Sequence, residues 1–156
     1  MIELTIEDFG PLRLEHLVCD FNGTLAQDGK LIVGVASRIS ELSRQIDIHV
    51  VTADTHGTAV RELASLPCTV KAIEATDQDA QKLAYVEALG LNRVVAIGNG
   101  RNDRSMLASV GLGIAVIGPE AAATQTLHAA HLVVQDINVA LGLLQHPKRL
   151  IATLRS

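Results

Sequence analysis

Aromatic residues are nearly absent from this chain of 156 residues, which has no tryptophan, one tyrosine and two phenylalanines. Proteins that recognise nucleobases or sugars commonly stack them on aromatic rings, so this scarcity argues against such ligands. Hydrophobic residues nevertheless make up 48% of the chain. Valine, leucine, isoleucine and alanine must therefore fill the core, and this composition favours β-branched parallel strands covered by helices.

Positive charge and cysteine are also scarce. The formal net charge of −4 leaves no basic face for a polyanion, which argues against nucleic acid as a partner. Cys19 and Cys68 are not part of a CxxC pair, so we expect neither a disulfide framework nor a zinc site, and a reducing cytoplasm is the simplest setting. The acidic start MIELTIEDFGPL is not typical of a signal peptide, and no run approaches the ~20 apolar residues of a membrane span.

Strand and helix patterns alternate along the chain. Residues 2–14 predict a β-hairpin that turns at Gly10-Pro11, and residues 16–19 predict a strand that stops at Asp20. Further strands are expected at 46–51, 68–73, 93–98, 112–117 and 131–134, with helices at 35–45, 58–66, 77–89, 102–110, 120–130 and 138–144 and from Pro147 onward. This order predicts one α/β domain over residues 1–156, a three-layer Rossmann-like fold with a mostly parallel sheet and helices on both faces.

Residues able to do chemistry follow the expected strands. In such sheets functional groups gather at the carboxyl ends of the strands, where this sequence has Asp20, Thr52 and the Gly98-Asn99-Gly100 turn. Asp20 is either a turn or N-cap aspartate or a nucleophilic carboxylate, and Thr52 is either an N-cap or a hydroxyl that holds a phosphoryl oxygen. Thr24 is a similar candidate, and Asp20 and Asp103 could share a divalent cation.

Three segments in order resemble the haloacid dehalogenase superfamily, most closely its P-type ATPase phosphorylation domains and their small relatives without membrane segments. They are DFNGTL, VVTADT and GNGRNDRSML, and the resemblance extends over roughly residues 14–135. It implies a phosphatase of small phosphorylated molecules in which Asp20 forms an aspartyl-phosphate that water hydrolyses.

The same resemblance implies a role for each matching position. Thr52 and Ala53 would hold phosphoryl oxygens together with the backbone after Asp20. Lys82, or else Lys71, would neutralise charge at the phosphoryl group, the alternative being a plain solvated lysine. The resemblance also implies Mg²⁺ as cofactor. The backbone groups that would bind phosphate belong to Phe21, Asn22, Gly23 and Thr24. The Mg²⁺ ligands would be Asp20, Asn22, Asn99 and Asp103.

Two positions depart from the family pattern. Asn22 stands where many family phosphatases have an acid–base Asp, and Asn99 stands where the family has an Asp that binds Mg²⁺. Amides transfer no protons and carry no charge, so we expect slow turnover and weaker Mg²⁺ binding. A non-catalytic phosphate-binding or regulatory protein with the same fold is the alternative, and dehalogenase chemistry is a poorer one because aromatic residues that could cradle a halide are lacking.

The intervals between the motifs leave no room for a cap domain. Each is filled by one crossover, so water must be excluded from the site by a large substrate or by a neighbouring subunit. Relatives without a cap are often tetramers, so we expect a homo-oligomer, with a tetramer favoured. The Asp28-Gly29 turn predicts a small flap, and His56 is a candidate for the mouth of the pocket.

Overall fold

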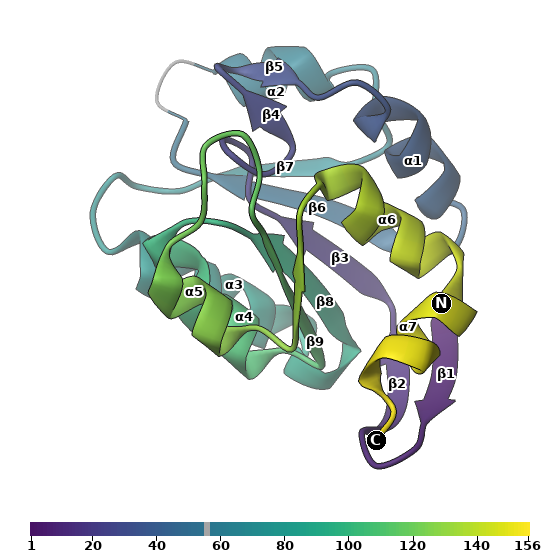
Figure 1. Cartoon of the computed structure of the whole chain (residues 1–156). Helices are drawn as coiled ribbons and strands as arrows, with labels where there is room; N and C mark the ends of the chain where they lie inside the picture. The colour runs from purple at the N-terminus through teal and green to yellow at the C-terminus, as the bar shows by residue number, and fades with distance from the viewer. Residues whose placement is uncertain (55–56) are drawn as a thin grey trace.

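Six parallel strands form the centre of the computed structural model, which describes residues 1–54 and 57–156 (Figure 1). They lie in the order β10-β9-β8-β3-β6-β7, and every neighbouring pair is parallel. Their bounds are β3 (His16–Cys19), β6 (Asp47–Thr52), β7 (Thr69–Ala72), β8 (Val94–Gly98), β9 (Leu112–Val116) and β10 (Leu132–Val134). The predicted parallel α/β architecture is confirmed.

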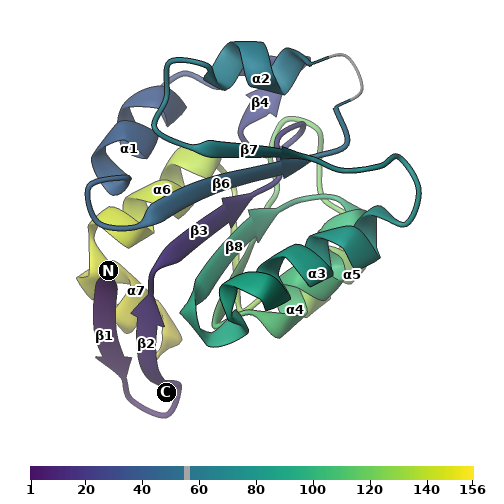
Figure 2. The ribbon, with the colours of Figure 1, turned by 180° about the vertical axis from the view of Figure 1, so that it is seen from behind.

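Helices cover both faces of this sheet. On one face α3, α4 and α5 lie side by side, and on the other α1 packs against α6, with α7 continuing to the N-terminal strands (Figures 1 and 2). Among the described residues, no helix is long and apolar enough to cross a bilayer. The helix bounds are α1 (Val35–Leu42), α2 (Thr58–Leu63), α3 (Gln78–Leu89), α4 (Arg104–Ser109), α5 (Thr124–Ala129), α6 (Ile137–Gln145) and α7 (Pro147–Leu154).

The central strands bury side chains on both of their faces. In β3, Leu17 and Cys19 join the core under α1 and α6, whereas Val18 joins the core under α3 and α4. Successive side chains of a strand point to opposite faces, so a strand buried on both sides becomes a continuous apolar run. Aliphatic side chains supply nearly all of this packing, and Phe21 is the largest of the fully buried side chains.

Two small antiparallel pairs flank the central sheet. The first pairs β1 (Ile2–Ile6) with β2 (Gly10–Leu14), and the second is the expected flap, which pairs β4 (Ala26–Gln27) with β5 (Lys30–Leu31). The first turn lies at residues 7–9, where Asp8 has a φ of 63°, and not at Gly10-Pro11 as predicted. Pro11 instead pairs with Thr5, and proline is tolerated there because β2 lies at the edge of its two-stranded sheet.

The helix expected over residues 120–130 begins only at Thr124. Residues 118–123 form a loop in which Ala121 has a φ of 61° and pairs with Gly118 in an isolated bridge. Alanine is the best helix former, so its tertiary contacts, described below, override its propensity. The other predicted helices and strands are present, with ends that differ by up to three residues.

Candidate active site

The register of three parallel strands brings the candidate side chains to one edge of the sheet. Cys19 at the end of β3 pairs with Val50 of β6 on one side and with Ile97 of β8 on the other. Asp20 directly follows, and its backbone N–H donates to the carbonyl of Ile97 at 3.0 Å. Thr52 ends β6, and Asn99 follows β8. The carboxyl ends of β3, β6 and β8 therefore frame one site.

A buried lysine joins two carboxylates at this site. The Nζ of Lys82 lies 2.7 Å from Oδ1 of Asp20 and 2.6 Å from Oδ1 of Asp103. Lys82 and Asp103 are fully buried, and the side chain of Asp20 is 12% exposed. Lys82 comes from α3 and Asp103 ends the 3₁₀ helix η2 (Arg101–Asp103), so the ion pairs connect three separate chain segments.

Backbone amides hold the second oxygen of Asp103. Its Oδ2 accepts hydrogen bonds from the N–H groups of Asn99 at 3.0 Å and Gly100 at 2.9 Å. Close approach requires glycine at Gly98, because a Cβ there would lie 2.5 Å from Cγ of Asp103. Asp103 is therefore fixed in place by Lys82 on one oxygen and by the β8 turn on the other.

Burial and like charge alter the protonation of the site. Burial, followed by repulsion from Asp103, raises the pKa of Asp20 to about 7, although Lys82 acts in the opposite direction. Burial alone would lower the pKa of Lys82, but the two neighbouring carboxylates outweigh it and leave that pKa raised. With all three groups ionised, the trio carries one net negative charge, which favours an additional cation beside Asp20.

The loop after Asp20 turns back on itself through its own backbone. The carbonyl of Phe21 accepts from the N–H groups of Thr24, Leu25 and Ala26, and the N–H of Gly23 donates to Ala26. The amides of Gly23 and Thr24, expected to bind phosphate, are therefore already paired within the loop. Phe21 packs into the core, whereas Asn22 is exposed.

Of the other residues that the sequence predicts for the site, some lie at the site and others lie at the surface. Thr52 is 3% exposed, and Ala53 after it is half-buried. Lys71 is exposed on the edge strand β7, so Lys82 and not Lys71 is the lysine that reaches Asp20. His56 lies outside the described residues.

Asn99 uses both ends of its carboxamide. Its Oδ1 accepts from the hydroxyl of Thr24 at 3.1 Å, and its Nδ2 donates to the carbonyl of Ala121 at 3.0 Å. Ala121 therefore belongs to the surroundings of the site, although the alanine-rich sequence around it predicts a helix. A run of three alanines carries no signal that could have revealed this contact.

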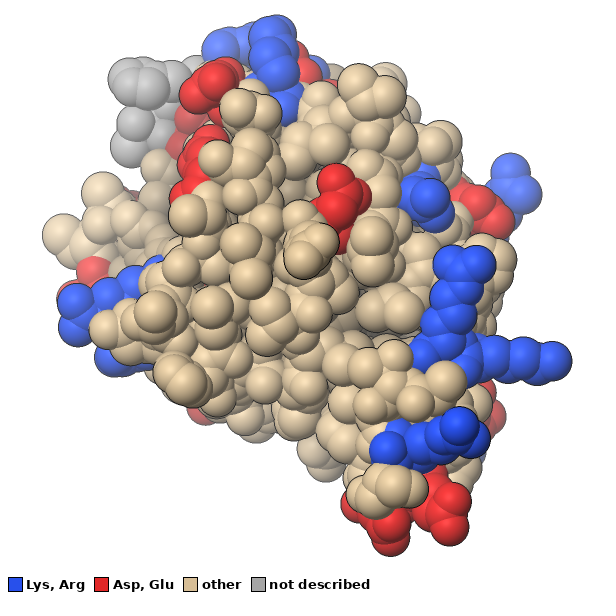
Figure 3. All heavy atoms as spheres, viewed as in Figure 1, with Lys and Arg blue, Asp and Glu red and all other residues tan. Residues whose placement is uncertain are grey.

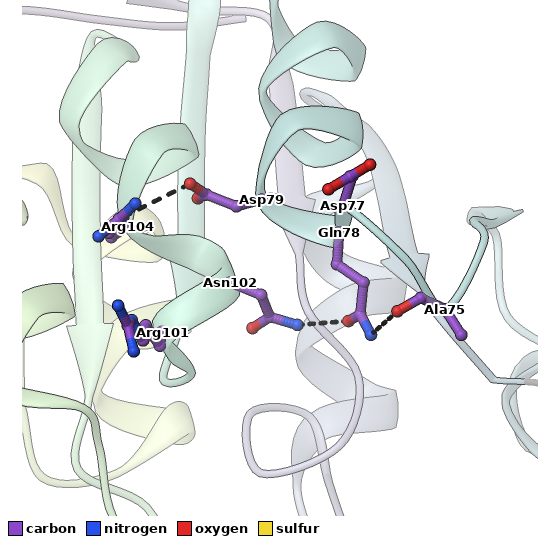
Figure 4. A pocket seen from close by; sticks show the side chains of 7 residues that line it. All are labelled: Ala75, Asp77, Gln78, Asp79, Arg101, Asn102 and Arg104. Carbon is purple, nitrogen blue, oxygen red and sulfur yellow. Dashed lines mark hydrogen bonds and ion pairs between the residues drawn. The ribbon is translucent and has the colours of Figure 1, made fainter.

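A cavity of about 340 Å³ lies between the two segments that supply Lys82 and Asp103 (Figure 4). Across it, Nδ2 of Asn102 donates to Oε1 of Gln78 at 2.5 Å, and Arg104 pairs with Asp79 at 3.4 Å. The side chains of η2 and α4 thus hold the start of α3 in register. This bracing fixes the helix that carries Lys82.

The oxygen donors of the site fit Mg²⁺ in chemistry but offer few charges. Mg²⁺ prefers hard oxygen ligands, and Asp20, the carbonyl of Asn22 and the amide oxygen of Asn99 are of this kind. Asp103 lies beside them, with Oδ1 bound to Lys82 and Oδ2 bound to two backbone amides, so it is the most engaged of the four expected ligands. Among the described residues, no group of three or more His, Cys, Asp or Glu side chains could hold a metal ion.

Comparisons with known proteins agree with this architecture. Residues 71–144 match the model of the haloacid dehalogenase-like hydrolase family. The uncharacterized protein MJ0073 of Methanocaldococcus jannaschii is 49% identical over 63 residues, which are 40% of this chain and 68% of that protein. The chain belongs to the haloacid dehalogenase-like hydrolase family.

Two solved structures show the same fold at low sequence identity. A 3-deoxy-D-manno-octulosonate 8-phosphate phosphatase from Moraxella catarrhalis, in complex with magnesium, phosphate and its sugar acid, has a TM-score of 0.70 at 17% identity, covering 91% of this chain and 94% of that one. The cobalt-bound deoxy-D-mannose-octulosonate 8-phosphate phosphatase from Haemophilus influenzae has a TM-score of 0.67 at 15% identity, covering 92% and 90%.

The raised pKa of Asp20 predicts a pH-dependent stability. The folded state holds a proton on Asp20 up to about pH 7, whereas an unfolded aspartate loses it near its ordinary value of 3.8. The resulting stabilisation is present below the unfolded pKa and is lost as the pH rises through about 7. Relative to Asp20→Asn, the wild-type free energy of unfolding should therefore fall between pH 4 and pH 8 by on the order of 2–4 kcal/mol.

Urea unfolding in the presence of a chelator measures this difference. Substituting Asp8, which is exposed in the turn between β1 and β2, by Asn is the matched control for the loss of one carboxylate. If the free energies of unfolding of wild type and Asp20→Asn differed by the same amount at every pH in this range, the raised pKa of Asp20 would be contradicted.

Proposed function

We propose that this protein is a Mg²⁺-dependent phosphatase of small phosphorylated molecules that acts through an aspartyl-phosphate on Asp20. The observation that carries the proposal is the carboxylate of Asp20, nearly buried at the carboxyl end of β3 and held by the ammonium of Lys82. Burying a carboxylate costs free energy, which Lys82 offsets here, and perturbed carboxyl groups of this kind cluster at catalytic sites. The phosphatase names of the two structural neighbours support the same class of substrate.

The chain's own residues account for the nucleophilic step. Lys82 binds Oδ1 of Asp20, so the other carboxylate oxygen attacks the phosphorus in line. A bond forms between Asp20 and phosphorus while the bond from phosphorus to the leaving oxygen breaks. Lys82 and the hydroxyl of Thr52 neutralise and hold the phosphoryl oxygens. Water then attacks the aspartyl-phosphate, which releases inorganic phosphate and restores Asp20.

The proposed cofactor is Mg²⁺, which Asp20, the carbonyl of Asn22, Asn99 and Asp103 would hold. When bound, it supplies positive charge that offsets the charge of the phosphoryl group. Because Asn99 is an uncharged amide, we expect Mg²⁺ to bind more weakly than at a site with three carboxylates. The cytoplasm is the proposed location, where Cys19 and Cys68 stay free thiols.

Hydrolysis of p-nitrophenyl phosphate tests the proposal. With Mg²⁺ the wild type should release p-nitrophenol, and Asp20→Asn should abolish this release because an amide cannot form the acyl phosphate. The alternative, a non-catalytic phosphate-binding protein, predicts no turnover by either protein but retained binding of inorganic phosphate. Equal hydrolysis by wild type and Asp20→Asn would contradict the proposal that this protein is a phosphatase that acts through Asp20.

The exposed Asn22 predicts a slow second half-reaction. Its amide cannot donate a proton to the leaving oxygen or accept one from the attacking water, whereas general acid–base help is typically worth ~10²–10⁴-fold. Wild-type enzyme should therefore release a burst of p-nitrophenol and accumulate phosphoenzyme. Asn22→Asp should remove the burst and raise steady-state turnover about 10²-fold. Turnover that is unchanged in this variant would show that position 22 does not limit the rate.

A homo-oligomer is the proposed working form, with a tetramer favoured. The structure has no cap domain between β3 and β8 in its described residues, and the face around the edge strand β10 shows few charged side chains (Figure 3). Ile117, Val133 and Val139 are 43%, 47% and 51% exposed on neighbouring segments there. An open apolar sheet edge commonly pairs with another chain. Residues 1–156 would act as one domain in each subunit.

Light scattering coupled to gel filtration measures the assembly. Wild type should elute as a tetramer, and Val133→Lys should reduce its mass without changing the circular dichroism spectrum. Val60→Lys is the matched control, because Val60 is 54% exposed on α2, away from β10. A monomeric wild type at micromolar concentration would contradict the proposal.

A further inference from the structure

Asn99 contacts the loop of residues 118–123 from two sides. Its Nδ2 donates to the carbonyl of Ala121 at 3.0 Å, and its own carbonyl accepts from the N–H of Ala123 at 2.9 Å. Behind this loop, the fully buried Thr126 donates its hydroxyl hydrogen to the carbonyl of Gly100 at 2.6 Å. The turn after β8 therefore holds both the loop and the start of α5.

The same loop also lies against the loop that follows Asp20. A Cβ on Gly118 would lie 3.0 Å from the carbonyl oxygen of Gly23, and a Cβ on Gly23 would lie 2.5 Å from Nδ2 of Asn99. At its far end, Glu120 accepts from the N–H of Asp28 in the flap at 3.5 Å. Figures 1 and 2 both show the loop before α5 rising beside β4.

These contacts form a closed ring around one side of the site. From Asn99 the ring continues through Thr24 to Gly23, across to Gly118, and back through Ala121. Ala121 is held in a left-handed conformation, with a φ of 61°, that alanine rarely adopts without compensation. The hydrogen bond from Asn99 to its carbonyl is a direct source of that compensation.

We propose that Asn99 is a positioning residue that fixes the loop of residues 118–123 as a permanent wall of the active site. This inference rests on the proposed function and explains why an amide stands at position 99. An aspartate would keep an acceptor for Thr24 but would place a carboxylate oxygen against the carbonyl of Ala121, where a donor is required. The wall covers on one side what a cap domain would otherwise cover.

Two variants each remove one of the two hydrogen bonds by which Asn99 holds the loop, and we call them the clamp variants. Asn99→Asp removes the donor to Ala121, and Ala123→Pro removes the N–H that donates to the carbonyl of Asn99. Ala123 has a φ of −69°, which lies in the range of proline, and no side chain of the proposed site changes in that variant. Asn102→Asp is the matched control, because it removes an equivalent donor from the same turn, the one to Gln78, without touching the loop.

Hydrogen exchange of the full chain without metal gives a readout that is independent of catalysis. In both clamp variants the amide of Ala121, which donates to Gly118, should exchange about 10-fold faster than in the wild type, and Asn102→Asp should leave it unchanged. Unchanged exchange in Asn99→Asp and Ala123→Pro would overturn the inference, whether or not the protein is a phosphatase. Circular dichroism confirms that each variant is folded.

Measurements of KM and kcat then distinguish a loop that forms a wall of the active site from a loop that only stabilises the fold. With saturating Mg²⁺ we expect Ala123→Pro to raise KM for p-nitrophenyl phosphate several-fold with little change in kcat, because the wall contacts substrate and transition state alike. A fall in kcat with an unchanged KM would contradict the role as a wall. Absence of any wild-type turnover would instead refute the proposed function and leave the exchange result standing.

Discussion

The ammonium of Lys82 between the carboxylates of Asp20 and Asp103 is the interaction on which the rest of the site depends. Two buried carboxylates so close together would repel strongly, and removing the cation of a buried ion pair commonly costs 3–5 kcal/mol. The three groups come from the end of β3, from α3 and from the turn after β8. The sheet, the α3 and α4 layer and the site are thus coupled, since displacing α3 would leave an unpaired charge in the interior.

Much of this arrangement could be predicted from the sequence. Uninterrupted apolar strands that end in Asp20, Thr52 and the Gly98 turn require a parallel sheet with its chemistry at one edge, and the structure has that sheet. The pairing of Lys82 with Asp20 followed from resemblance and not from any spacing rule, because the two residues are far apart in sequence. Burial of Lys82 distinguishes it from the exposed Lys71, and burial is a property that composition alone does not reveal.

Three features of the structure differ from what the sequence predicts. Residues 121–123 have helical composition, yet Asn99 holds the carbonyl of Ala121 and the N–H of Ala123 outside any helix. Similarly, Gly10-Pro11 is typical of a turn, but the hairpin turns three residues earlier and places Pro11 in β2. The amides of Gly23 and Thr24 were expected to face phosphate, but they close the loop itself. The first difference is due to a partner distant in sequence, whereas the other two are due to pairing within the hairpin and within the loop itself.

The two asparagines that replace family acids therefore differ in kind. Asn22 is exposed, and no hydrogen bond of its side chain ties it to the described part of the chain, so its amide alters proton transfer and little else. Asn99 is buried and donates and accepts at once, so its amide is part of the architecture of the site. An acid restored at position 22 meets no structural obstacle, whereas one at position 99 must break the contact with Ala121. Proton transfer is thus the main constraint at position 22, whereas hydrogen bonding to the loop of residues 118–123 is the main constraint at position 99.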